Sequence, residues 1–167
     1  MSTSALRPSA AVAEADWARR VAANREQAER LREDVPGDDF YAPVAQNFRA
    51  DPARRDDPTL NALLDLARPG DTWLDVGAGG GRFSLGIARA VRRMIAVEPS
   101  ASMRQVFRQT IADFRDDEGG RIANTELRAE RWPPASTDEY RADVALISHV
   151  GYDIEAIGPF LDALEAA

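Results

Sequence analysis

The chain has 167 residues, enough for one domain, and its hydrophobic fraction of 44% and charged fraction of 29% are ordinary for a globular protein. Its net charge of −7 argues against a general nucleic-acid surface, which needs basic patches to neutralise phosphates. It contains no cysteine, which excludes disulfides and thiolate chemistry and favours a reducing cytoplasm, and no metal site is predicted.

The amino-terminal part, residues 1–56, is predicted to hold a disordered tail and a helical cap segment. Residues 1–16 lack an apolar core long enough for a signal peptide or a membrane span. Asp16 is expected to cap a helix that runs to about Glu33, with a charged, solvated polar side. The short aromatic segment Phe40–Phe48 follows, and a second helix is expected within it.

The next helix is predicted to lead the chain into the first strand. Asp57 is an expected N-cap with Pro58 at the first helical position, and the helix ends at Pro69-Gly70. Thr72–Val76 is short, apolar and rich in β-forming residues, which predicts a buried strand. The helix that Asp57 caps is interpreted as a structural element that leads the chain into this strand.

A glycine-rich turn follows this strand and joins it to a helix and a second strand. The turn runs from Gly77 to Gly81, and Ala78 alone interrupts its glycines. Apolar residues at helical spacing predict a helix over Arg82–Val91, and Met94–Val97 reads as a strand that Glu98 closes. This βαβ unit predicts a nucleoside site at the carboxyl ends of its strands, where an acid can accept hydrogen bonds from ribose hydroxyls.

Three kinds of ligand compete for such a turn. A dinucleotide fingerprint requires a small residue where this chain has Arg82. A phosphate-binding P-loop requires lysine, and the chain has none. The remaining pattern is D-x-G-x-G-x-G, in which Asp75 is the acid and Glu98 follows 23 residues later.

The segment Asp75–Gly81, together with Val97-Glu98-Pro99-Ser100, resembles the class I S-adenosylmethionine-dependent methyltransferases. The resemblance implies a Rossmann-like α/β fold and S-adenosylmethionine as the cofactor. It also implies that Asp75 orients the loop and the cofactor's amino group, and that Glu98 holds the ribose. The other residues that it assigns to the cofactor here are Gly77, Ala78, Gly79, Gly81 and Pro99.

Two further elements carry residues that the resemblance places near the adenine. Ser100 is an expected N-cap of a helix whose inner face includes Met103, which the resemblance sets beside the adenine. A third strand is predicted over 124–129. Glu130 and Arg131, directly after it, occupy the positions that contact the adenine amino group and a ring nitrogen in the family. Trp132 is expected either to flank the adenine or to cover the sheet edge.

The fourth strand is predicted over Asp143–Ser148, an apolar run typical of a parallel strand covered on both faces. In the family, the end of this strand brings methyl donor and acceptor together, and Ser148 and His149 lie there. His149, the single histidine, is a candidate general base, and the alternative is that both residues only shape the cofactor pocket. The Asn/Asp-Pro-Pro-aromatic motif of amino-methylating nucleic-acid enzymes is absent.

The last predicted element is a helix within Ile154–Ala167, with Gly158-Pro159 at the start of its regular part. The expected sheet order is 3-2-1-4, with helices on both faces and the helical extension at the amino terminus. The family's sheet continues with further strands, so residues 57–167 are interpreted as a partial domain. The fourth strand is then an exposed edge that could pair with another chain.

The leading functional hypothesis is methyl transfer from S-adenosylmethionine to a small-molecule acceptor, with no membrane partner and nucleic acid disfavoured. A second hypothesis is a module that binds the cofactor without catalysis, as a fragment or a regulatory chain. A nicotinamide-dependent oxidoreductase is disfavoured by Arg82, and a protein or nucleic-acid methyltransferase stays open because fold alone does not name the acceptor.

Overall fold

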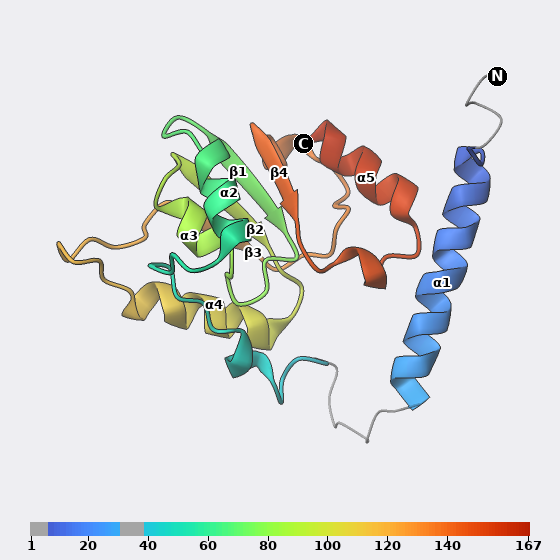
Figure 1. Ribbon diagram of the computed structural model, residues 1–167, viewed down its shortest axis with the longest axis horizontal. Helices are drawn as coiled ribbons and strands as arrows, with labels where there is room; N and C mark the ends of the chain where they lie inside the picture. Colours follow the sequence, from blue (N-terminus) through green and yellow to red (C-terminus); the bar gives the residue numbers. More distant parts are fainter. Residues whose placement is uncertain (1–6, 31–38) are drawn as a thin grey trace.

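A computed structural model describes residues 7–30 and 39–167 and shows a four-stranded parallel sheet flanked by helices (Figure 1). The sheet order is β3-β2-β1-β4, which confirms the predicted 3-2-1-4 arrangement. The strands are β1 (Thr72–Val76), β2 (Arg93–Val97), β3 (Thr125–Arg128) and β4 (Val144–Ile147). Because all pairs are parallel, the carboxyl ends of the strands meet at one edge of the sheet.

Helices cover both faces of the sheet, as predicted. Three helices pack on one face: α2 (Pro58–Leu66), α3 (Ser84–Ala88) and α4 (Ala101–Asp113). The other face is covered by α5 (Ile157–Ala166), whose buried Phe160 packs with strand residues such as Leu74 and Ile95. Both central strands are therefore buried on two sides, which explains their continuous apolar sequences.

Two helix starts are fixed by the predicted caps. The Oδ1 atom of Asp57 accepts hydrogen bonds from the amides of Thr59 (2.9 Å) and Leu60 (3.1 Å) at the start of α2. The hydroxyl of Ser100 accepts a hydrogen bond from the amide of Met103 at 3.1 Å at the start of α4. Both side chains satisfy amides that have no partner within the helix.

The predicted start of the first helix is wrong. Helix α1 spans Ala10–Arg30, so Asp16 lies inside it and pairs with Arg19 and Arg20 instead of capping it. The sequence between Ala10 and Asp16 is rich in alanine, the strongest helix former, and this run extends the helix through part of the predicted tail. Residues 1–6 of that tail and the helix end expected near Glu33 lie outside the described residues.

Several other predicted elements are shorter or shifted. The helix expected within Phe40–Phe48 is only a 3-10 turn, η2 (Ala45–Phe48). The helix expected over Arg82–Val91 has regular hydrogen bonding only in α3, because the glycine turn passes directly into it and the chain bends towards β2 after Ala88. Helix α5 begins one residue before Gly158, and β3 is trimmed at both ends. Shifts of one or two residues are normal at element ends.

Helix α1 lies beside α5 and the 3-10 turn η4 (Gly151–Asp153), on the side of β4 (Figure 1). The indole Nε1 of Trp17 donates to the carbonyl of Ile154 at 2.7 Å, and Arg25 pairs with Glu155. The buried Val21 lies between these two contacts on the same helix. These contacts hold α1 against the segment that follows β4.

Strand β4 is only partly buried, and within the described residues it pairs with β1 alone. The fourth strand is predicted to be covered on both faces, and this cover is incomplete because Ala145 is exposed. Pairing of this edge with another chain stays a prediction. Among the described residues, no helix combines the length and apolar character needed to cross a membrane.

Candidate functional site

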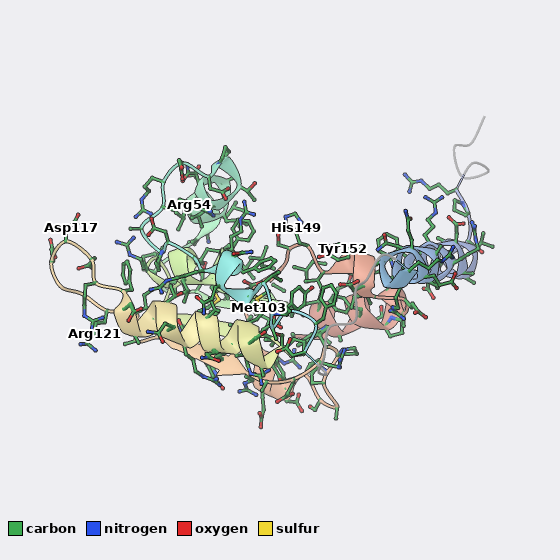
Figure 2. The ribbon with its side chains drawn as sticks, turned by 90° about the horizontal axis from the view of Figure 1, so that it is seen from below. Arg54, Met103, Asp117, Arg121, His149 and Tyr152 are labelled. Carbon is green, nitrogen blue, oxygen red and sulfur yellow. The ribbon has the colours of Figure 1, made fainter. Side chains whose placement is uncertain are left out.

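A cavity of about 1370 Å³ opens at the carboxyl ends of the strands. Pockets for one small ligand measure roughly 300–1,000 Å³, so this one has room for two molecules. Met103, His149 and Tyr152, which line it, are labelled in Figure 2, where the turn carrying Asp117 lies far from them. Eleven of the twelve predicted site residues line the cavity: Asp75, Gly77, Ala78, Gly79, Glu98, Pro99, Met103, Glu130, Arg131, Ser148 and His149.

Gly81 is the predicted site residue that the structure does not bring to the cavity. A Cβ atom at this position would lie 2.7 Å from Leu85 and 3.0 Å from Phe107, and its φ is +91°. Glycine is therefore required here for close packing of the loop on the core. Its position supports a structural role, and contact with a cofactor is not supported.

Glu98 lies at the end of β2 with only 6% of its surface exposed. One carboxylate oxygen accepts from the amide of Gly79 at 2.8 Å, and the other accepts from the amide of Ser100 at 2.7 Å. Burial raises the pKa of this carboxyl, and the two amide hydrogen bonds oppose that rise. The side chain is thereby fixed between the glycine loop and the start of α4.

Asp75 is buried at the end of β1, beneath the glycine loop. Its carboxylate accepts a hydrogen bond from the hydroxyl of Ser84 at 2.5 Å. Burial is the largest cause that raises the pKa of Asp75 to about 6, and the nearby charge of Glu98 adds to it. The ionised carboxylate is thus costly at this buried position, and a cationic group beside it would lower that cost.

Replacing Asp75 with asparagine should remove part of the pH dependence of stability. The folded-state pKa of about 6 lies above the ordinary 3.8, so the stabilising contribution is present below pH 4 and is lost as pH rises through 6. Asp75→Asn should therefore be more stable than the unsubstituted protein near pH 7, by about 2–3 kcal/mol. Thermal unfolding of both proteins from pH 4 to 8 measures this, and a stability difference that does not grow between pH 4 and 6 would contradict it.

The glycine loop is packed closely against two other parts of the chain. A Cβ atom on Gly80 would lie 2.1 Å from the backbone oxygen of Phe48, and one on Gly77 would lie 2.2 Å from Val150. Gly77 also has a φ of +81°, which favours glycine. The loop is therefore held between the segment before α2 and the segment after β4.

The segment that begins at Asp39 contributes to the lining of the cavity. The carboxylate of Asp39 accepts hydrogen bonds from the hydroxyl of Ser100 (2.9 Å) and the amide of Ser102 (2.8 Å) at the start of α4. Further along, the side chains of Tyr41 and Tyr152 lie close enough to affect the pKa of each other. Burial raises the pKa of Tyr41 to about 12, so its hydroxyl stays neutral. The amino-terminal segment and the segment after β4 thus meet at the cavity.

The residues after β3 line the cavity but are partly committed to other contacts. Glu130 accepts a hydrogen bond from the hydroxyl of Tyr140 at 2.5 Å. The indole of Trp132 donates to the carbonyl of Phe160 at 3.1 Å and packs on the core beneath α5. Trp132 also lines the cavity, so the two predicted alternatives for this residue are compatible. The adenine contacts of Glu130 and Arg131 stay predictions.

His149 follows β4 and lines the cavity with an exposed side chain (Figure 2). Its backbone has a φ of +57°, an uncommon conformation for a residue other than glycine. Such backbone geometry gathers at functional sites, where the surrounding structure enforces it. The sequence placed His149 correctly at this edge, and the structure adds the backbone conformation.

Sequence reasoning missed four arginines that line the cavity: Arg25, Arg49, Arg54 and Arg82. Arg54 and Arg82 both bind Asp57, at 2.6 and 3.0 Å. Their positions in the sequence, 28 residues apart, show no pattern that joins them. Their proximity follows from the contact between Phe48 and the glycine loop.

No protein-family model matches the chain, and no curated protein matches its sequence. Solved structures do match. The magnesium protoporphyrin IX methyltransferase of Synechocystis PCC 6803, solved with bound S-adenosylmethionine, is 17% identical over 65% of this chain and 52% of its own, with a TM-score of 0.52. An rRNA methylase from Streptococcus thermophilus is 21% identical, covers 67% of this chain and 68% of its own, and has a TM-score of 0.47.

An RNA methyltransferase from Salinibacter ruber, solved with S-adenosylhomocysteine, is 23% identical over 57% of this chain and 60% of its own, with a TM-score of 0.43. The chain spans about half the length of the Synechocystis enzyme, and 30% and 20% of two other matched structures. The likeness to the Synechocystis enzyme shows the fold. The chain therefore has the Rossmann-like fold of class I methyltransferases.

Proposed function

We propose that this chain binds S-adenosylmethionine and transfers its methyl group to a small-molecule acceptor. The observation that carries the proposal is the buried carboxylate of Glu98, fixed at the end of β2, hydrogen bonded to the glycine loop and lining a large cavity. An acid at this place in a parallel sheet is suited to holding a ribose. The fold is compatible with this chemistry, and the site residues carry the argument.

The residues present fit such a cofactor. A carboxylate offers about four lone-pair positions, and the amides of Gly79 and Ser100 occupy two of those on Glu98. Two positions therefore remain for the two hydroxyls of a ribose. Asp75 supplies a buried negative charge beneath the loop, suited to the cationic amino group of the cofactor. Met103, only 3% exposed, offers an apolar wall for the adenine.

When bound, S-adenosylmethionine supplies an electrophilic methyl group on a sulfonium. The chain's part is then to position the acceptor in line and to exclude water. Tyr41 and Tyr152, which both line the cavity, are placed to help exclude water. His149 is placed to take the proton that the acceptor loses, and we propose it as the general base.

A small acceptor is favoured by the form of the site. The cavity has volume for a second molecule beside a cofactor, and aromatic residues including Tyr41, Phe48 and Tyr152 line it. The net charge of −7 disfavours a nucleic-acid surface. A protein or nucleic-acid acceptor, or cofactor binding without turnover, are the alternatives that experiment must separate.

Calorimetric titration of the 167-residue chain with S-adenosylmethionine, S-adenosylhomocysteine and NAD tests the proposal. Micromolar binding of the first two and none of NAD is the expected result. Release of S-adenosylhomocysteine in the presence of a panel of small acceptors, proteins and RNA then separates an enzyme from a binding module. A folded, monodisperse protein that binds neither adenosyl compound would overturn the proposed function.

Replacing His149 with asparagine tests the proposed base. Asparagine accepts left-handed backbone, so the φ of +57° is retained while the imidazole is removed. We expect an affinity for S-adenosylhomocysteine within about threefold of the original and a turnover lowered by about 10²–10⁴-fold. Turnover is measured with an acceptor found in the panel, as a function of pH. An unchanged rate and pH profile would show that positioning alone performs the chemistry.

A further inference from the structure

One part of the cavity lining is basic. Arg54 and Arg82 both line the cavity, and the contact of Gly80 with the backbone of Phe48 brings their two segments together. The acidic lining residues lie elsewhere: Asp75 and Glu98 are at the ends of β1 and β2, and Asp39, Glu130 and Asp153 are on other segments. In a chain with a net charge of −7, this separation polarises the cavity.

The two guanidinium groups are held in place by one carboxylate. The Oδ2 atom of Asp57 contacts Arg54 at 2.6 Å and Arg82 at 3.0 Å. Its Oδ1 atom is fixed by the amides of Thr59 and Leu60 at the start of α2. Asp57 is 8% exposed, so the carboxylate that orders both arginines is itself rigid. Ordered side chains lose less conformational freedom when a ligand binds.

Arg54 and Arg82 have positive charge and hydrogen-bond donors that Asp57 does not satisfy. Two positive charges face one negative charge, which leaves an excess of one positive charge. The Nε atom of Arg54 is buried, and within the described part of the chain it has no hydrogen-bond partner. The side chain of Arg82 is 57% exposed, and Asp57 contacts only its Nη2 atom. A buried donor without an acceptor is unfavourable, so an anion placed here would relieve that cost.

We propose that Arg54 and Arg82 form a subsite for the carboxylate of a bound ligand. A single negative charge matches the excess charge of the pair, and the planar guanidinium suits the planar carboxylate. The proposal rests on the proposed function, because the pair lines the cavity assigned there to cofactor and acceptor. The carboxylate belongs either to the amino-acid part of the cofactor or to an acidic acceptor.

Two nucleosides that differ in the amino-acid part distinguish these sources. S-adenosylhomocysteine carries the carboxylate, and 5′-methylthioadenosine keeps the nucleoside and the sulfur without it. If the cofactor supplies the carboxylate, Arg82→Gln should weaken S-adenosylhomocysteine binding at least tenfold and change methylthioadenosine binding less than twofold. Arg82→Lys, which keeps the charge without the fork of donors, should lose less affinity than Arg82→Gln.

A second titration follows if Arg82→Gln binds both nucleosides with the same affinities as the original protein. Benzoate is titrated into both proteins saturated with S-adenosylhomocysteine, and ligand-observed NMR reads its binding. Binding to the original that Arg82→Gln loses would assign the subsite to an acceptor carboxylate. Equal affinity for benzoate in the two proteins would overturn the proposal. An equal loss of affinity for both nucleosides in Arg82→Gln would also overturn it.

Arg131→Gln is the matched control, because Arg131 also lines the cavity but lies after β3. It should leave the ratio of the two nucleoside affinities unchanged. Arg54→Gln provides a second variant if Arg82→Gln does not fold, and thermal unfolding checks both. If the original protein binds neither nucleoside, the proposed function fails, and the subsite fails with it. If the original protein binds methylthioadenosine as tightly as S-adenosylhomocysteine, the cofactor is excluded as the source of the carboxylate. An acidic acceptor then stays as the source that the benzoate titration tests.

Discussion

Replacing Glu98 with alanine should abolish measurable binding of S-adenosylmethionine and S-adenosylhomocysteine. We expect a loss of about 100-fold or more, because two hydrogen bonds from ribose hydroxyls to an ionised group contribute about 1.5–3 kcal/mol each. The same change leaves the amides of Gly79 and Ser100 without their acceptor. The loop would therefore lose a contact that holds it in its binding shape.

The measurement is calorimetric titration of both proteins, with thermal unfolding as a check on folding. Glu98→Gln separates the two contributions, since it keeps the shape and one acceptor oxygen but removes the charge. It should bind more weakly than the original and more tightly than Glu98→Ala. Glu165→Ala, on the exposed surface of α5, is the matched control and should change nothing. Full affinity in Glu98→Ala would exclude Glu98 as the ribose acceptor.

Replacing Gly80 with alanine should separate the amino-terminal segment from the glycine loop. The added Cβ atom would lie 2.1 Å from the backbone oxygen of Phe48, and a backbone atom cannot rotate away. Overpacking of this kind costs about 1–3 kcal/mol, which lowers the unfolding temperature by roughly 5 °C. Because Arg54 lies in the same segment as Phe48, the basic pair Arg54 and Arg82 should be displaced, and the affinity for S-adenosylhomocysteine should fall at least tenfold.

The control for this substitution is Gly70→Ala. Gly70 lies in the turn before β1, and a Cβ atom there would meet nothing within 4 Å. Its unfolding temperature and ligand affinity should stay close to those of the original protein. Thermal unfolding and calorimetry on the three proteins provide the comparison. If Gly80→Ala binds ligand normally, the segment at Phe48 is not part of the binding site.

Much of the fold follows from local sequence. The strands β1 and β2 are short apolar segments between turn residues, and the caps Asp57 and Ser100 are visible because N-capping acts within three residues. The order 3-2-1-4 could be predicted from the motif at Asp75 and its family resemblance. The errors lie where local signals are weak, as at the start of α1 and in the short turn η2.

The candidate site likewise has residues that the sequence predicts and contacts that only the tertiary structure shows. The sequence by itself determined that Asp75, Glu98 and His149 meet at one edge, because each follows a strand of a parallel sheet and parallel strands end together. Only the tertiary structure decided that Gly81 faces the core, that Tyr41 reaches Tyr152, and that Arg54 and Arg82 share Asp57. Those contacts join segments far apart in the chain, and they depend on how loops pack. Packing of that kind leaves no periodic signal in the sequence.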